Sequence, residues 1–172
     1  MVSELEHAKQ LAELGTIQAG FEKEGFGSEL LERSPEIPLH VLLLPLGKDG
    51  RGRDRVVNLN FVPLPESDIE WIRLLQLYTV VPCDIAPDRR GAVESLLLAA
   101  NGVLPLGHFG IKEDGEVYAR YVYTVPSSRT VSADELLEVV SLFHYMLEMF
   151  AERIDRVAGG TLSPDDAMRE LN

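Results

Sequence analysis

Residues 132–157 read SADELLEVVSLFHYMLEMFAERIDRV and give the strongest helix signal in the chain. Ser132 stands three residues before Glu135, the spacing of a capping box, in which each side chain bonds a free amide of the first turn. Apolar residues then recur at alternating steps of four and three, which predicts one buried stripe along a long helix. This first stripe consists of Leu136, Val140, Phe143, Leu147, Phe150, Ile154 and Val157.

A second apolar stripe lies beside the first. Its members are Val139, Leu142, Met146 and Met149. The remaining side of the helix is expected to face solvent and carries Asp134, Glu138, Ser141, Glu148, Glu152 and Asp155. Two stripes make a wider apolar surface than a one-sided helix needs. We therefore expect a second neighbour, which is either the first helix of the chain or a second subunit.

Two predicted strands, 107–112 and 116–125, precede this helix and flank Glu113-Asp114-Gly115. A two-residue Asp-Gly turn would mix the apolar side chains of the hairpin with Lys112. A three-residue loop with Gly115 left-handed instead pairs Ile111 with Val117. We favour the three-residue loop because it gathers one apolar surface to face the Leu136–Leu147 part of the first stripe. That surface consists of Phe109, Ile111, Val117, Ala119 and Tyr121.

The other elements are predicted by caps, periodicity and turn residues. They are a helix from Ser3 to about Glu24, strands 39–46, 55–64 and 69–81, a helix over 88–102, and a short helix from Ser163. The run 69–81 is long for a strand, but its Trp, Tyr, Thr and Val content favours a strand over a helix. In the first helix, one face is traced by Leu5, Ala8, Ala12, Gly15, Ala19 and Glu22. The helix over 88–102 ends on Asn101-Gly102, which predicts a left-handed stop.

The resulting order is α-βββ-α-ββ-α, which is an α+β layout. We predict a five-stranded antiparallel sheet with helices packed mainly on one face. The length of 172 residues favours a single domain over residues 1–160, followed by a short helix or tail over 161–172.

The charge balance narrows the classes of partner. The chain has 16 basic and 28 acidic residues, so its net charge is −12. Such a charge repels phosphate backbones and anionic lipids, which argues against nucleic-acid and membrane-surface binding. Cys83 is the only cysteine, and no signal peptide or membrane-spanning run is evident. We expect a cytoplasmic protein.

No residue pattern in the sequence specifies a reaction, a metal or a cofactor. The chain lacks the spacings of zinc sites, nucleophile elbows and phosphate-binding loops. The Gly-rich stretch 47–53 lies between two predicted strands, so a flexible hairpin tip is expected there. Arg51, Arg53 and Arg55 nevertheless form a basic spot on an acidic protein, and they are the candidate contacts for an anion.

The second half of the chain resembles the YbjN-like bacterial family, most clearly from Leu96 to Ile154. The shared pattern is a helix ending in Asn, a G-x-F strand, a D-G hairpin, an apolar strand, a capping Ser and a long helix. It is carried by LLLAANGVLPLGHFGIKEDGEVYARYVYTVPSSRTVSADELLEVVSLFHYMLEMF. The resemblance implies the fold of type III secretion chaperones, which are small acidic cytoplasmic homodimers that hold unfolded segments of partner proteins. It implies no catalytic residues.

These observations favour a non-enzymatic protein-binding module, a homodimeric chaperone-like adaptor or regulator that holds a segment of a partner protein. The candidate partner or dimer contacts are Val139, Leu142, Phe143, Met146, Met149 and Phe150. The alternative function is a regulator that senses a small molecule or anion through the loop over 47–55.

Overall fold

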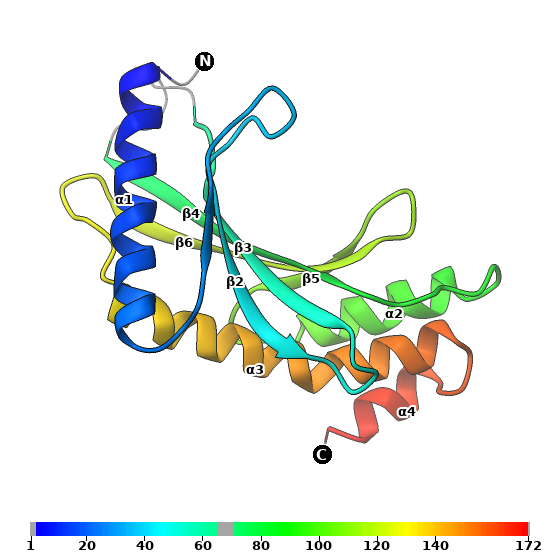
Figure 1. Ribbon diagram of the computed structural model, residues 1–172. Helices are drawn as coiled ribbons and strands as arrows, with labels where there is room; N and C mark the ends of the chain where they lie inside the picture. The colour runs from blue at the N-terminus through cyan, green and yellow to red at the C-terminus, as the bar shows by residue number, and fades with distance from the viewer. Residues whose placement is uncertain (1–2, 65–70, 172) are drawn as a thin grey trace. The chain divides into compact units, whose positions relative to one another are not determined.

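The computed structural model describes residues 3–64 and 71–171, and they form an α+β fold with an open antiparallel sheet (Figure 1). The elements are α1 (Glu4–Lys23), β1 (Glu29–Leu31), β2 (Val41–Lys48), β3 (Asp54–Phe61), β4 (Ile72–Val81), α2 (Arg90–Asn101), β5 (His108–Ile111), β6 (Val117–Pro126), α3 (Ala133–Ala158) and α4 (Pro164–Arg169). The strands are ordered β1-β2-β3-β4-β6-β5 across the sheet.

The prediction of five strands is wrong, because β1 adds a sixth strand at one edge of the sheet. β1 pairs antiparallel with the start of β2, with Glu29 opposite Leu43 and Leu31 opposite Val41. Three residues are too few for an alternating pattern to show, so this stretch was expected to be a connector. β1 covers only the first residues of β2. Beyond it lies exposed Pro45, which has no N–H to donate and suits an uncovered edge.

The three strands predicted next are confirmed as β2, β3 and β4. In β3 the alternation buries Val57, Leu59 and Phe61, whose exposed fractions are 0%, 0% and 2%. The run predicted over 69–81 is a strand from Ile72 to Val81. Its first two residues lie outside the described part of the chain.

The predicted register of the β5–β6 hairpin is confirmed. Ile111 lies opposite Val117, and Phe109 lies opposite Ala119. Gly115 has a φ of 92°, so it occupies the left-handed position that the three-residue loop requires.

The N-terminus of α1 is capped as predicted, since the Glu6 backbone N–H donates to Ser3 Oγ (3.2 Å). The buried side of α1 differs from the face traced in the sequence. Leu5 is 66% exposed, whereas the buried residues are His7, Gln10, Glu13, Leu14, Ile17 and Phe21. Two of the three buried polar residues have hydrogen-bond partners: Glu13 pairs with Arg73 and accepts from the Val131 backbone N–H, and Gln10 donates to Glu6.

The predicted left-handed end of α2 is wrong. Gly102 has a φ of −71° and a ψ of −17°, which is right-handed helical geometry. α2 packs against β5 and α4.

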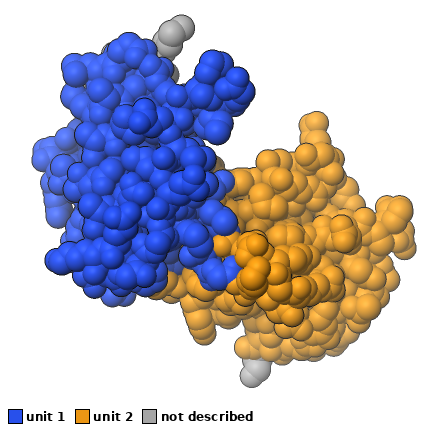
Figure 2. Space-filling model, viewed as in Figure 1, with its two compact units in different colours: residues 1–47, 56–77, 122–140 blue, residues 48–55, 78–121, 141–172 orange. Residues whose placement is uncertain are grey.

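The described residues divide into two compact units, coloured separately in Figure 2. Unit 1 comprises residues 1–47, 56–77 and 122–140, and unit 2 comprises residues 48–55, 78–121 and 141–172. β2, β3, β4, β6 and α3 contribute residues to both units. The predicted C-terminal helix is present as α4 in unit 2, where it contacts α2. The single domain over residues 1–160 stays a prediction.

Candidate functional site

The long helix α3 begins as its sequence predicts. The Glu135 backbone N–H donates to Ser132 Oγ (3.3 Å). Every member of the first stripe is buried, with exposed fractions between 0% and 4%. In unit 2, Phe150 of this stripe meets Phe109 of the hairpin, with ring centroids 5.6 Å apart and edge to face. The hairpin surface therefore contacts the first stripe at Phe150, beyond the Leu136–Leu147 part for which the sequence predicted the pairing.

The six candidate partner contacts fall into two groups. Phe143, Met146 and Phe150 are 3%, 8% and 0% exposed, so they lie in the core of the chain. Leu142 is 41% exposed, and Val139 and Met149 are half-buried. Burial therefore removes three of the six from any surface that a partner could reach without rearrangement of the core.

Tyr145 is an exposed aromatic residue on the same side of α3 that the candidate set omits. It is 61% exposed and lies three residues after Leu142. Residues at this spacing share a helix face. We call Val139, Leu142, Tyr145 and Met149 the α3 apolar row. The sequence contained a signal for Tyr145, because its spacing of three residues from Leu142 places it beside the second stripe, on the side that faces solvent.

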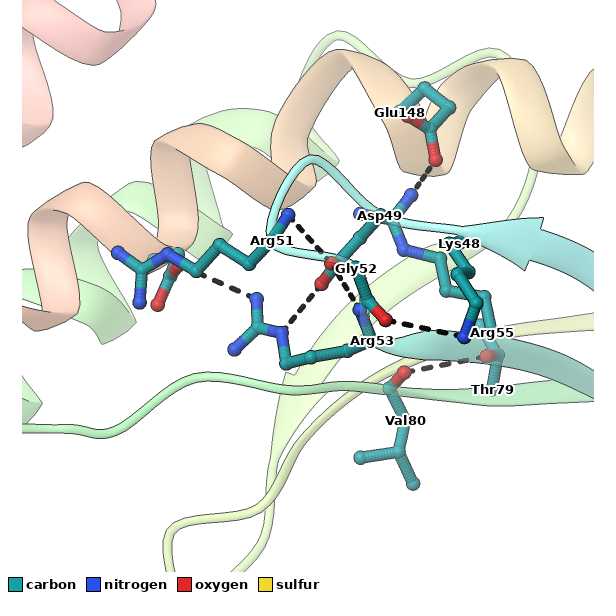
Figure 3. A network of polar contacts seen from close by, with 10 residues as sticks. Lys48, Asp49, Arg51, Gly52, Arg53, Arg55, Thr79, Val80 and Glu148 are labelled. Atoms are coloured by element: carbon teal, nitrogen blue, oxygen red, sulfur yellow. Dashed lines mark hydrogen bonds and ion pairs between the residues drawn. The ribbon is translucent and has the colours of Figure 1, made fainter.

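The loop between β2 and β3 is a closed turn, not the flexible tip expected from its glycines. The side chain of Asp49 is 2% exposed and accepts from the backbone N–H groups of Arg51 and Arg53, both at 2.9 Å. It also accepts from Arg53 Nε (2.6 Å), as Figure 3 shows. The Asp49 backbone N–H donates to Arg53 O (2.9 Å), which closes the loop.

These contacts set the charge state of Asp49. Burial raises the pKa of the Asp49 carboxyl, but the hydrogen bonds from Arg53 and Arg51 and the charge of Arg53 outweigh burial. The pKa is lowered from 3.8 to about 2. Asp49 is therefore ionised at neutral pH and neutralises Arg53 from within the loop.

Two of the three candidate anion contacts bind a carboxylate of α3. Arg51 Nε lies 2.8 Å from Asp155 Oδ2, and Arg53 Nη2 lies 3.4 Å from the same oxygen. Asp155 was expected to face solvent, and that expectation is wrong, because the loop covers it and leaves the residue 6% exposed.

The third arginine, Arg55, is 6% exposed in its side chain and pairs with Glu148 of α3. His144 Nε2 also lies 3.4 Å from Glu148 Oε1. Burial and the neighbouring charge of Arg55 lower the pKa of His144. Glu148 and Asp155 stand seven residues apart and so share one side of the helix. The seven-residue spacing of these two carboxylates and the arginines at every second position of the loop together indicate ion pairs between the loop and α3. The sequence analysis did not use this signal.

Cys83 lies near this network as a half-buried free thiol. Burial, followed by the charge of Asp155, raises the pKa of the thiol to about 11. A thiol in this state is protonated at neutral pH and is a poor nucleophile.

The described residues contain no cluster of three or more His, Cys, Asp or Glu side chains that could hold a metal ion. Within the same residues, no helix combines the length and apolar character needed to cross a membrane.

A family model matches residues 71–156, which is half of the chain, and it describes the YbjN family as "Putative bacterial sensory transduction regulator". The chain belongs to the YbjN family. The family predicted from the sequence is thereby confirmed. The YbjN description is of a regulator and names no reaction. No curated protein matches the chain.

Two motifs that carried the YbjN resemblance meet in the structure. The helix-ending Asn101 donates from Nδ2 to Phe109 O (2.9 Å), and the Phe109 backbone N–H donates to Asn101 Oδ1 (2.8 Å). Lys112 donates its N–H to Glu116 O (2.9 Å), so alternate residues of β5 bond β6. By this alternation the N–H and C=O of Phe109 point to the open edge of β5, where the Asn101 amide occupies both. Sequence reasoning took this Asn for a helix stop and missed the contact.

Proposed function

We propose that this YbjN family member is a non-enzymatic regulatory module that acts in the cytoplasm by binding protein. It pairs as a homodimer through the α3 apolar row and holds a segment of a partner protein. The supporting observation is the row itself, with Leu142 41% exposed and Tyr145 61% exposed beside the buried stripe. Exposed apolar side chains at helical spacing are suited to packing against another helix.

The sheet edges are poorer candidates for binding a partner strand. On β5, the edge-facing groups of Phe109 are already bonded by Asn101. On β2, the part beyond β1 contains Pro45, which cannot donate to an added strand. Both devices are typical of sheets protected against edge pairing. This leaves a helix surface as the better-supported contact.

The holding of a partner segment is supported by the element order. The order α-βββ-α-ββ-α of type III secretion chaperone-like proteins is contained in this chain, with β1 and α4 as additions. The net charge of −12 favours a basic segment and disfavours nucleic acid.

The alternative of anion sensing through the loop over 47–55 lacks comparable support. Arg51, Arg53 and Arg55 each have a carboxylate partner within the chain. An incoming anion would have to displace Asp155, Asp49 or Glu148, and the displaced carboxylate would lose its own charge partner.

The dimer is tested by sedimentation velocity at micromolar concentration. We expect the unaltered chain to sediment as a dimer. Leu142→Glu and Tyr145→Glu place a charge in the row, so each should weaken dimerisation about tenfold or more. The matched control is Leu98→Glu on α2, because Leu98 is 77% exposed and the change in charge is the same.

A monomeric parent chain would contradict the proposal. So would dimers of undiminished stability in both row variants. Unfolding in urea shows whether the row variants remain folded, and at such exposed positions we expect a small change in the free energy of unfolding.

A further inference from the structure

Unit 1 contains a pocket of about 880 Å³. It lies between the N-terminal half of α1, the C-terminal end of β3, the first residues of β4 and the loop over 127–131. Sites for small molecules occupy roughly 300–1,000 Å³. The pocket is therefore large enough for such a ligand, and neither the family description nor the proposed function assigns it one.

Four side-chain and backbone contacts fix one wall of the pocket. Glu13 of α1 pairs with Arg73 of β4 and also accepts from the Val131 backbone N–H (2.8 Å). Arg73 Nη2 donates to Arg129 O (2.6 Å), and the guanidinium lies over the Phe61 ring, 5.3 Å from its centroid. These contacts tie the helix, the strands and the loop together, so the pocket is held in place before any ligand arrives.

The remaining lining mixes polar and apolar side chains. Its apolar members come from α1, from the residues after β3 and from β4, and they are Leu5, Ala12, Val62, Leu64 and Ile72. Leu5 is 66% exposed on α1, which leaves an apolar side chain uncovered at the pocket. These apolar members of the lining fit the hydrocarbon part of a ligand.

Charge at the pocket points to an anionic group. Lys9 and Arg129 line it, and no carboxylate of the described residues lies within ion-pair distance of either one. Among the described lining residues, the carboxylates are Glu6 and Glu13, and Glu13 already pairs with Arg73. Lys9 and Arg129 are therefore the two lining cations available to a ligand.

We propose that this pocket binds a small amphipathic monocarboxylate. The hydrocarbon part lies against the apolar members of the lining, and the carboxylate is bound by Lys9 and Arg129. The ammonium group of Lys9 and the guanidinium group of Arg129 are both suited to charge-assisted hydrogen bonds with a carboxylate. The site is independent of the α3 apolar row, so failure of either proposal leaves the other standing.

Trp71 provides a direct readout. It is the single tryptophan of the chain, it is 71% exposed, and it precedes Ile72 of the pocket. Its carbonyl accepts from the backbone N–H of Ser127, another pocket residue (2.9 Å). We expect titration with decanoate to change the Trp71 emission saturably, and decanol, which has the same chain without the charge, to bind at least about tenfold more weakly.

Three variants locate the site. Lys9→Ala combined with Arg129→Ala should weaken decanoate binding about tenfold or more, whereas Glu6→Gln should strengthen it by removing an opposing charge. Lys23→Ala is the matched control, because it removes a lysine from the same helix but from outside the pocket.

Saturable decanoate binding that the double variant weakens and Lys23→Ala leaves unchanged would support the proposal. No saturable change in emission, confirmed by the absence of heat in calorimetry, would overturn it. Equal binding of decanol and decanoate would overturn the assignment of a carboxylate ligand. Circular dichroism shows that each variant is folded before it is titrated.

Discussion

Asp49 shows how one carboxylate can order a loop that carries three arginines. Its oxygens accept two backbone N–H groups and Arg53 Nε inside a turn of five residues. A charged acceptor with several short bonds is stronger than a neutral one. The basic residues that looked available in the sequence are therefore part of the internal structure of unit 2.

The low pKa of Asp49 makes a stability prediction with a definite sign. In the folded chain the pKa is about 2, against 3.8 for an ordinary aspartate. Between these values the unfolded chain binds the proton first, so stability falls as the pH drops from about 4 toward 2. Above this window the contribution is fully present. We call this fall in the free energy of unfolding at low pH the acid limb. Asp49→Asn should remove the part of it that comes from Asp49, as measured by urea unfolding at a series of pH values.

At neutral pH the same variant should lose about 1–3 kcal/mol, because it weakens bonds to a charged acceptor. Asp54→Asn is the matched control, at the first residue of β3 next to the loop. Asp54 pairs with Lys48, but its side chain is 76% exposed, so we expect a change of at most about 0.5 kcal/mol. An Asp49→Asn variant with an unaltered acid limb would contradict the prediction.

The sequence predicted the loop between β2 and β3 only in part. Its three arginines were predictable as a basic cluster because they lie close together in the sequence. Their partners were not, because Asp155 is 102 residues away from Arg53 and was assigned to the polar side of its helix. The helical pattern assigns polar residues to the solvent-facing side of the helix. It does not indicate that a loop will cover one of the charged residues on that side.

At the scale of elements, the contact of α1 with the start of α3 depends on a missing side chain. A Cβ at Gly20 of α1 would overlap the Cβ of Ala133, whereas a Cβ at Gly15 of the same helix would lie 3.9 Å from Leu30, an ordinary contact. Two glycines in one helix therefore have opposite roles. One permits close packing, and the other only lowers helix stability.

Gly20→Ala should destabilise the chain by about 1–3 kcal/mol through overpacking, although alanine favours the helix. Gly15→Ala is the control and should stabilise by about 0.5–1 kcal/mol. The double variant Gly20→Ala with Ala133→Gly should regain most of the loss. The coupling energy follows from urea unfolding of the parent chain, Gly20→Ala, Ala133→Gly and the double variant. A coupling energy of zero would contradict the packing argument.

The edge contact of Asn101 is also open to measurement. Asn101→Ala removes both bonds to the Phe109 backbone, so we expect faster hydrogen exchange at the Phe109 amide and a loss of about 1–3 kcal/mol. Asn101→Asp keeps an acceptor for that amide but provides no donor for Phe109 O. It should give intermediate exchange, and unchanged exchange in Asn101→Ala would show that the contact does not protect the edge.

Elements with strong local signals were predictable, and those defined by their neighbours were not. The β5–β6 register followed from one glycine and one apolar surface. β1 could not be found because its three residues become a strand only by pairing with β2. The buried face of α1 was misassigned because His7 and Gln10 are buried there while Leu5 is exposed. Local periodicity carries no information about such tertiary choices.

For the whole molecule, element order predicted an α+β fold, and the resemblance of residues 96–154 predicted the YbjN family. Both predictions are confirmed. Neither could predict the pocket of unit 1, because its lining comes from four separate stretches of the chain. The two proposals therefore differ in origin. The α3 apolar row follows from the spacing of apolar residues in one helix. The carboxylate site depends on the packing of segments that are far apart in the sequence.

The interleaving of the two units has a consequence for synthesis of the chain on the ribosome. Unit 1 needs residues 122–140, and unit 2 needs residues 141–172, so neither is complete while the first two thirds of the described residues emerge. Apolar strands such as β2 and β3 therefore emerge before the later residues of either unit are available. Apolar strands exposed in an incomplete chain are prone to aggregate. The high negative charge and the proline on β2 would therefore oppose aggregation of the nascent chain as well as of the folded protein.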